Sequence, residues 1–373
     1  MSSRIHAIEA AEGDCLLLEC DGRFALIDGG VARSYEARLQ PWLRAVLPAG
    51  QPLQAVIVSH VDTDHISGVL DLLADIERAR ADGEPDPWRV AELWHNGFGE
   101  VLDDAEGWLA GNLRAMMGQA GRVRVAAANG AAATLGIAQG ARLQRLAVKL
   151  GIAMNRPTAG RPITQEAMAG RTWDLGRTRL TVIGPTRPNL EALRQDWIAW
   201  IERNTDRFAL GDAQAMADAD DSVPNLSSIV LCAATPAGEV LLTGDARGDH
   251  ILQGLEQAGL LAADGSRHFR LLKLQHHGSA RNATPEFFRR VTADIYLISA
   301  NGRHGNPDEA LLRMILDSAQ GSGRQPVIAA TNDCAPLAQF RAANPPDRSG
   351  YALILRDPAR DALTVDLQSG EVR

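Results

Sequence analysis

The sequence is poor in cysteine and contains no long apolar run. Its 373 residues include four cysteines, and no two of them form a Cys-x-x-Cys pair. Most of them lie in apolar surroundings, as in "GDCLLL" and "IVLCAA", so we expect buried free thiols rather than a disulfide framework. No apolar run approaches the length of about 18 residues that a membrane span needs, and "MSSRIHAIEAAEGD" lacks the apolar core of a secretory signal. We therefore expect a cytoplasmic protein with no membrane segment.

Basic residues are also fewer than acidic residues, 38 against 46. The formal net charge is −8 at pH 7, so no global positive field would attract nucleic acid. Binding of nucleic acid would require a local basic patch. Hydrophobic residues make up 45% of the chain, which is ordinary for a globular protein with a sizeable core. The composition leaves the kind of activity to be decided by local motifs.

Strand-like and helix-like segments alternate along the chain. Short apolar runs such as "DCLLLEC", "RFALIDGG" and "LQAVIVSH" predict buried strands. The segment "GVLDLLADIERARADG" predicts a helix that begins near residue 66 and ends at Gly83. Strands and helices alternate again after residue 175, and the ending "YALILRD…ALTVDLQ" predicts a hairpin. This alternation predicts a layered α/β fold.

The segment from about 100 to 175 differs from the rest. It is rich in Ala, Gly, Arg and Leu and contains no metal-type cluster of side chains. We interpret it as a mostly helical insertion within a single domain spanning residues 1–373, where it serves as a lid, a substrate wall or a docking surface for a protein partner. Its arginines offer either a local positive surface or the solvated face of helices: Arg114, Arg122, Arg124, Arg142 and Arg145.

The clearest chemical signal is the stretch "VIVSHVDTDHISGV". Two histidines and two aspartates follow an apolar run within six residues: His60, Asp62, Asp64 and His65. In an extended loop, alternation places the first three on one side, so one short loop can offer ligands to two neighbouring cations. Imidazole suits Zn, Mn and Fe, and carboxylate suits the harder of these ions. The alternative is a polar loop that caps the following helix, with Asp64 as its N-cap.

Other predicted strands also end in polar side chains. The strand in "LLTGDA" ends at Asp245, and "LLKLQHHGS" ends in His276 and His277. A carboxylate such as Asp245 can bridge two metals about 3.5 to 4 Å apart, and a water between them ionises near neutral pH. The early "LIDGG" places Asp28 after a strand, where it either orients a histidine ligand or forms a turn. Together these strand ends predict a metal site with two cations.

The order of these motifs resembles the metallo-β-lactamase fold superfamily. "LIDGG", "SHVDTDHISG", "LLTGDA" and "LKLQHHGS" carry the resemblance, supported by "AEGDCLLLE", "NLSSIVL" and "ISANGRHGNP". More narrowly, the set resembles the metallo-hydrolase domain of bacterial DNA-uptake (competence) channel proteins and their stand-alone relatives. The resemblance covers about 1–100 and 175–335. It implies a four-layer αβ/βα sandwich of two mixed sheets, with a metal cleft at their shared edge.

The resemblance also implies a set of ligands for two divalent metal ions, Zn or Mn. These ligands would be His60, Asp62, Asp64, His65, Asp245, His276 and His277. The first two would bind one metal, Asp64 and His65 the other, and Asp245 both. One of the adjacent histidines, preferably His277, would complete the second site while its neighbour contacts substrate.

Two departures from the superfamily pattern concern the first site. The commoner motif is His-x-His-x-Asp-His, and Asp62 stands in place of its middle histidine. The histidine usually found between the second and fourth motifs has no match, because "PNLSSIV" occupies that place, so Asn225 or Ser227 would face the metals instead. The first site is therefore rich in oxygen, which favours Mn over Zn. His304 in "GRHGNP" resembles a substrate-contacting residue that stabilises charge on a phosphoryl oxygen, or else is a loop histidine.

The predicted activity is hydrolysis of a phosphoester, most simply a phosphodiester. A metal-bridging hydroxide would attack phosphorus while the cations neutralise the other oxygens, with Asp64, Asp245 and His304 as catalytic residues. The resemblance makes nucleic acid the first substrate expectation. The alternatives are hydrolysis of a small ester, lactone or phosphocholine-type substrate, and a non-catalytic metal-binding interaction protein.

Overall fold

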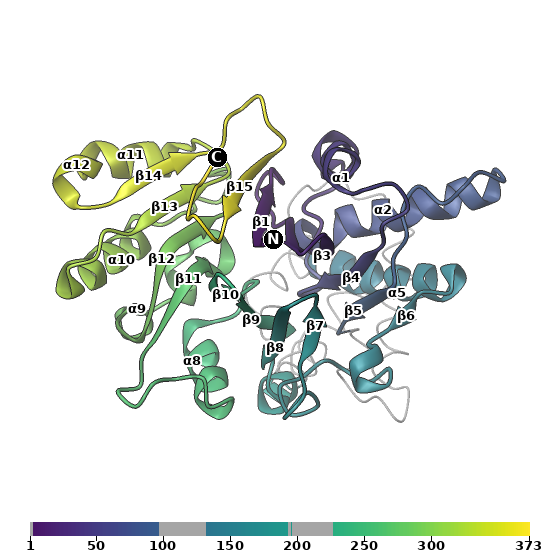
Figure 1. Cartoon of the computed structure of the whole chain (residues 1–373), viewed down its shortest axis with the longest axis horizontal. Helices are drawn as coiled ribbons and strands as arrows, with labels where there is room; N and C mark the ends of the chain where they lie inside the picture. Colours follow the sequence, from purple (N-terminus) through teal and green to yellow (C-terminus); the bar gives the residue numbers. More distant parts are fainter. Residues whose placement is uncertain (1–2, 97–131, 193–194, 196–226) are drawn as a thin grey trace, which may run out of the picture.

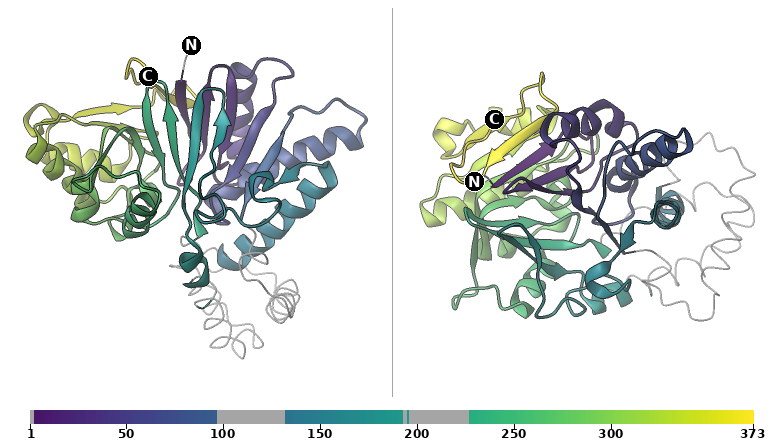
Figure 2. Two further views of the ribbon diagram at one scale, coloured as in Figure 1. Left: turned by 60° about the horizontal axis from the view of Figure 1, so that its bottom comes forward. Right: turned by 45° about the vertical axis from the view of Figure 1, so that its right-hand side comes forward.

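Two sheets lie face to face, and helices cover the outer side of each (Figure 1, Figure 2). The computed structural model describes residues 3–96, 132–192, 195 and 227–373. Within these ranges the first sheet has seven strands in the order β15-β1-β2-β3-β4-β5-β6, and the second has eight in the order β14-β13-β12-β11-β10-β9-β8-β7. The predicted four-layer αβ/βα sandwich is confirmed.

Both sheets are mixed. The strands of the first are β1 (Ser3–Ile8), β2 (Leu16–Cys20), β3 (Arg23–Ile27), β4 (Leu53–Val58), β5 (Glu92–His95), β6 (Ala153–Met154) and β15 (Ala362–Asp366). Those of the second are β7 (Trp173–Leu175), β8 (Thr178–Gly184), β9 (Val230–Thr235), β10 (Gly238–Leu242), β11 (Arg267–Lys273), β12 (Val291–Ile298), β13 (Val327–Ala330) and β14 (Ala352–Leu355). Pairing changes from antiparallel to parallel between β3 and β4 in the first sheet and between β10 and β11 in the second. The carboxyl ends of parallel strands are where open α/β sheets bind their ligands.

The helices divide between the two outer faces. Those beside the first sheet are α1 (Gln40–Val46), preceded by the π-helix η1 (Tyr35–Leu39), α2 (Thr63–Ala81) and α5 (Ala132–Leu150). Those beside the second are α8 (Gly248–Gln257), α9 (Pro285–Arg290), α10 (Glu309–Ser322), α11 (Ala335–Ala343) and α12 (Pro346–Ser349). Short 3-10 turns are η2 (Arg156–Thr158), η4 (Gln275–Gly278) and η5 (Ala280–Asn282). Among the described residues, no helix combines the length and apolar character that a membrane crossing requires.

Three apolar layers hold the four structural layers together. Strand β4 shows why: Ala55 and Ile57 pack between the sheets, whereas Val56 and Val58 pack under α2 and its neighbouring helices. Alternate residues of a strand face opposite sides, so an uninterrupted apolar run serves a sheet that is buried on both faces. A third core fills the space between the second sheet and α8–α11. All four cysteines are buried and unpaired.

The predicted C-terminal hairpin is wrong. Strand β14 pairs in parallel with β13 in the second sheet, whereas β15 pairs antiparallel with β1 in the first. Two neighbouring strand patterns predict a hairpin only when both strands join one sheet, and here each completes the edge of a different sheet. The terminal segment therefore ties the two halves of the sandwich together.

The predicted start of the second helix also differs from the structure. Helix α2 begins at Thr63, with Asp62 at its N-cap in an extended conformation. Asp64 and His65 therefore lie in the first helical turn rather than in an extended loop or at the cap. Because the chain changes from extended to helical after Asp62, the pair His60 and Asp62 is separated from the pair Asp64 and His65.

The predicted insertion is described only in part, because residues 100–131 lie outside the described ranges. In its described part, α5 packs against α2, and β6 pairs with β5 to extend the first sheet. Arg142 and Arg145 are exposed on α5. The other three arginines of the expected basic surface lie outside the described residues.

Candidate metal centre

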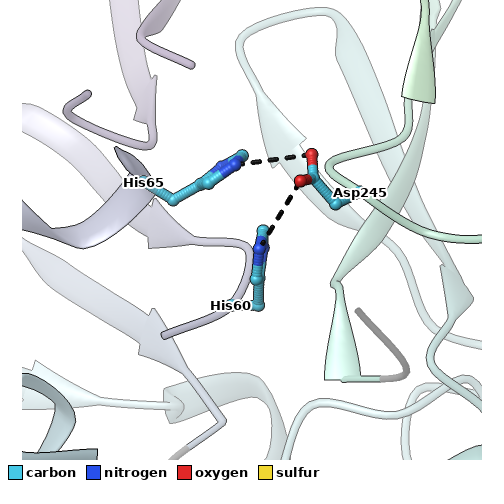
Figure 3. A group of neighbouring side chains, drawn as sticks. All are labelled: His60, His65 and Asp245. Carbon is cyan, nitrogen blue, oxygen red and sulfur yellow. Dashed lines mark ion pairs between the residues drawn. The ribbon is translucent and has the colours of Figure 1, made fainter. Parts of the chain in front are cut away.

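The predicted metal ligands converge where the ends of strands from both sheets meet. His60 follows β4 and His65 lies in the first turn of α2, while Asp245 follows β10 in the opposite sheet. Figure 3 shows the two imidazole rings reaching from one side toward the carboxylate that comes from the other. His276 and His277 follow β11, the parallel neighbour of β10. The site thus forms only when the two sheets pack.

Asp245 is at the middle of the group and is almost completely buried. Its Oδ1 lies 3.4 Å from Nε2 of His65, and its Oδ2 lies 3.8 Å from Nε2 of His60 and 3.5 Å from Nε2 of His277. Ligand atoms that each lie about 2 Å from a shared cation are roughly 3 to 4 Å from one another. The separations therefore fit a carboxylate and imidazoles arranged around cations.

The remaining carboxylates of the motif divide the centre into two half-sites. Oδ2 of Asp64 lies 3.2 Å from Nε2 of His277 and 3.8 Å from Nε2 of His65. Oδ2 of Asp62 lies 3.3 Å from Nε2 of His60. We call Asp64, His65 and His277 the His65 half-site, and we call His60 and Asp62 the His60 half-site; Asp245 is shared by both.

Hydrogen bonds fix which nitrogen of His65 and His60 faces the centre. Nδ1 of His65 lies 2.9 Å from Oδ2 of Asp28, an oxygen that only accepts when ionised. Nδ1 of His60 lies 3.0 Å from Oγ of Ser59, whose own proton goes to Asp28 at 2.7 Å. In the neutral form each ring therefore carries its proton on Nδ1 and directs the lone pair of Nε2 at the centre. This is the tautomer that metal-binding histidines adopt.

His277 is arranged in the same way. Its Nδ1 lies 2.9 Å from the backbone carbonyl oxygen of Ser299, which can only accept. The Nε2 atoms of His60, His65 and His277 are buried and have no hydrogen-bond partner among the described residues, and neither does Oδ1 of Asp245. Since buried polar atoms are normally partnered, these atoms are suited to a ligand that accepts lone pairs. The donor set fits divalent cations.

A buried ion pair beneath the centre was not predicted. Lys273 is completely buried at the end of β11 and pairs with Asp14, which is 1% exposed. Nζ of Lys273 also donates to the carbonyl oxygen of Gly244 at 3.3 Å and lies 4.0 Å from Oδ1 of Asp245. Asp14 in turn lies 3.3 Å from Nδ1 of His277. The signals were present in the sequence, as a lysine inside the apolar run "LLKLQ" and an aspartate before "CLLLE".

The loop that carries Asp14 approaches the 60–65 motif closely. The backbone N–H of Asp14 donates to the carbonyl oxygen of Asp64 at 3.2 Å. A Cβ atom at the preceding Gly13 would lie 1.9 Å from that same oxygen. Only glycine permits this contact, which explains why glycine precedes Asp14 and brings Asp14 under the predicted ligands.

Acidic and basic groups in the centre shift the pKa values of one another. Burial alone would raise the pKa of Asp245, but His65 and His277 hold that pKa well below its ordinary value. Burial alone would lower the pKa of His65 and His277, but Asp245 raises both well above the usual histidine value. Burial likewise opposes ionisation of Asp14, yet Lys273 lowers the pKa of Asp14 to about 2. Without cations the carboxylates favour the protonated forms of His65 and His277, and bound divalent cations would replace those protons.

Ser227, Asn225 and His304 are the remaining predicted site residues. Ser227 is buried, while its neighbour Ser228 places Oγ 3.4 Å from Nδ1 of His60 and accepts a hydrogen bond from the backbone of Asp245. Asn225 lies outside the described residues. His304 is exposed in the loop between β12 and α10. Ser228 was missed because its motif gives no indication of which serine faces inward.

Comparison with known proteins agrees with the motifs at the start of the chain. Residues 10–77 match the family model described as the metallo-beta-lactamase superfamily. The matched segment contains Asp14, Asp28 and the whole 60–65 motif. A search of curated proteins finds no match to the chain. Residues 10–77 thus carry the metallo-beta-lactamase superfamily match, and the two-sheet α/β sandwich around them is of the metallo-β-lactamase type.

Proposed function

We propose that the protein is a hydrolase that uses two divalent metal ions on either side of Asp245. One observation carries the proposal: buried imidazole nitrogens that have no hydrogen-bond partner in the described part of the chain approach Asp245 from the opposite sheet and from the neighbouring strand end. A cluster that only packed the core would leave the buried Nε2 of His60 without a hydrogen-bond partner, at a cost of about 1 to 3 kcal/mol. It would also have to keep His65 and His277 buried in their protonated forms beside Asp245. Cation binding removes that cost.

Each half-site would hold one cation, and Asp245 would contact both. When bound, two such ions lower the pKa of a water toward neutrality and offset charge on the oxygens of a substrate. The chain supplies the fixed geometry: Asp28 and the carbonyl of Ser299 hold the protons of two rings on Nδ1. Asp14 and Lys273 close the inner wall of the centre, because both are buried.

The accessible side of the centre indicates where substrate would approach. The side chains of Asp62, Asp64 and His276 are 24%, 26% and 34% exposed, whereas those of His65 and Asp245 are buried. We propose a phosphodiester as substrate, with nucleic acid as the first candidate, because both half-sites combine carboxylate with imidazole and so suit an ion such as Mn²⁺ that binds phosphoryl oxygens. Asp64 would hold one ion and face the substrate, and His304, exposed in its loop, would contact the phosphoryl group.

The test combines metal analysis with a hydrolysis screen. Purified protein is assayed on bis-(p-nitrophenyl) phosphate, single-stranded DNA and p-nitrophenyl acetate, with Mn²⁺ or Zn²⁺ and after chelation. We expect phosphodiester hydrolysis that is lost on chelation and in Asp245→Ala. The control variant Asp294→Ala should keep this activity, because it removes a carboxylate near the start of β12 that pairs with Arg270. Cleavage of the carboxylic ester alone would favour the small-ester alternative. Two bound metals without any hydrolysis would favour a non-catalytic metal-binding protein.

A further inference from the structure

Two consecutive histidines at the end of β11 adopt a backbone conformation that is rare for residues with a side chain. His276 has φ 46° and ψ 51°, and His277 has φ 55° and ψ 22°. Such left-handed pairs are strained and tend to persist where function requires them. In an extended strand the two side chains would point to opposite sides. Here both Nε2 atoms approach the same oxygen, Oδ2 of Asp245, at 3.9 Å and 3.5 Å.

Asn282 determines how the ring of His276 is presented. Nδ2 of Asn282 donates to the backbone carbonyl oxygen of Asp245 at 2.9 Å, and because a carbonyl only accepts, the amide can have only one orientation. Oδ1 of Asn282 therefore faces Nδ1 of His276, 2.9 Å away. The neutral ring then carries its proton on Nδ1 and its lone pair on Nε2, which is the arrangement of His60, His65 and His277.

The two half-sites differ in their number of ligands. Together with Asp245, the His65 half-site has four protein ligands, whereas among the described residues assigned so far the His60 half-site has three. The segment that provides a histidine in the commoner superfamily pattern contains serines here, and Ser228 contacts the outer nitrogen of His60 rather than its Nε2. A protein zinc site most often has four ligands.

We infer that His276 is the missing ligand of the His60 half-site, and that Asn282 is the residue that orients it. The inference rests on the proposed two-metal centre. A substrate-contacting histidine would point an N–H at the developing negative charge, but Asn282 holds the proton of neutral His276 on the opposite nitrogen. With His276 included, each half-site has two imidazoles, one carboxylate of its own and the shared Asp245.

Cobalt spectroscopy of a cysteine variant tests this assignment without measuring activity. In His276→Cys loaded with Co²⁺, a thiolate ligand gives a charge-transfer band in the near ultraviolet, and we expect this band at one thiolate per chain. The matched control is His268→Cys on the exposed face of β11, which should give no band, like the wild type with its buried cysteines. A His276→Cys protein that binds two Co²⁺ ions and lacks the band would overturn the inference.

Metal titration of His276→Ala provides the second measurement. We expect one of the two Mn²⁺ or Zn²⁺ ions to bind at least about 10-fold more weakly than in the wild type, with the other nearly unchanged. Two unchanged affinities would overturn the assignment of His276 and leave the two-metal centre intact. A wild-type chain that binds fewer than two ions would instead refute the proposed function itself, so the two failures are distinguishable.

Discussion

The two half-sites share one carboxylate but are supported by different chemistry. In the His65 half-site, the outer nitrogen of His65 bonds the carboxylate of Asp28, while that of His277 bonds the carbonyl oxygen of Ser299 and has the carboxylate of Asp14 3.3 Å away. In the His60 half-site, the outer nitrogen of His60 faces the hydroxyl oxygens of Ser59 and Ser228. A charged acceptor makes a ligand more basic than a neutral one does. We therefore expect tight binding at the His65 half-site and a more exchangeable ion at the His60 half-site.

The largest expected effect comes from the residue that the half-sites share. Asp245→Ala should weaken both metals together and reduce kcat/KM for bis-(p-nitrophenyl) phosphate by roughly 10³-fold or more, because metal ions contribute several kcal/mol of transition-state stabilisation. The measurement is metal content per chain together with steady-state kinetics. If this variant lost only one metal, or kept its activity, Asp245 would not lie between two ions.

Removing the buried ion pair should act mainly on the His65 half-site. Lys273→Met leaves Asp14 without its buried partner and should destabilise the fold by about 3 to 5 kcal/mol, as measured by urea unfolding of the metal-free protein. The double variant Asp14→Asn with Lys273→Met should recover much of that loss. In the folded double variant, which lacks the Asp14 carboxylate beside His277, we expect weaker metal binding at the His65 half-site. An equal effect on both half-sites would contradict the asymmetry.

His95 is a buried histidine outside the metal centre, and its pKa shifts in the direction opposite to the pKa of His65 and His277. Both ring nitrogens of His95 lack a hydrogen-bond partner within the described ranges, and burial lowers the pKa of His95 from 6.5 to about 4. Above pH 6.5 this residue is neutral in the folded and unfolded chains, so it has no effect on stability. Between pH 6.5 and 4 only the unfolded chain gains the proton, and the free energy of unfolding should fall by about 3 kcal/mol.

The check is the pH dependence of the free energy of unfolding in the wild type and in His95→Leu. The variant should lack this part of the loss between pH 7 and 4, while His268→Ala, at an exposed histidine, should behave as the wild type. Identical pH dependence in all three proteins would show that His95 does not remain neutral in the fold.

The smallest expected effects come from the residues that orient the rings. Asp28→Asn should weaken the ion of the His65 half-site by about 10- to 100-fold. Ser228→Ala should weaken the ion of the His60 half-site less, because a neutral oxygen 3.4 Å from His60 is the weaker support. Competition titrations with a chelating dye would measure both affinities. A larger effect of the serine variant would reverse the proposed ranking of the half-sites.

Strand ends made the clustering of these side chains predictable from the sequence, because parallel neighbours place their carboxyl ends at one edge. His60, Asp245 and His277 each follow a run of apolar residues that had to be a buried strand. The pairing of Lys273 with Asp14 was not predictable, since it joins residues 259 positions apart across the two sheets. The sheet to which β15 belongs depends in the same way on which edge remains open after the sheets have formed.

The central claim is that two cations lie on either side of Asp245, and anomalous diffraction tests it most directly. Crystals of the protein grown with Mn²⁺ or Zn²⁺ should show two anomalous peaks roughly 3.5 to 4 Å apart. One peak should contact Asp64, His65 and His277, the other should contact His60 and Asp62, and both should contact Asp245. Crystals in which this carboxylate contacts no anomalous peak, or in which the peaks lie elsewhere in the fold, would contradict the account.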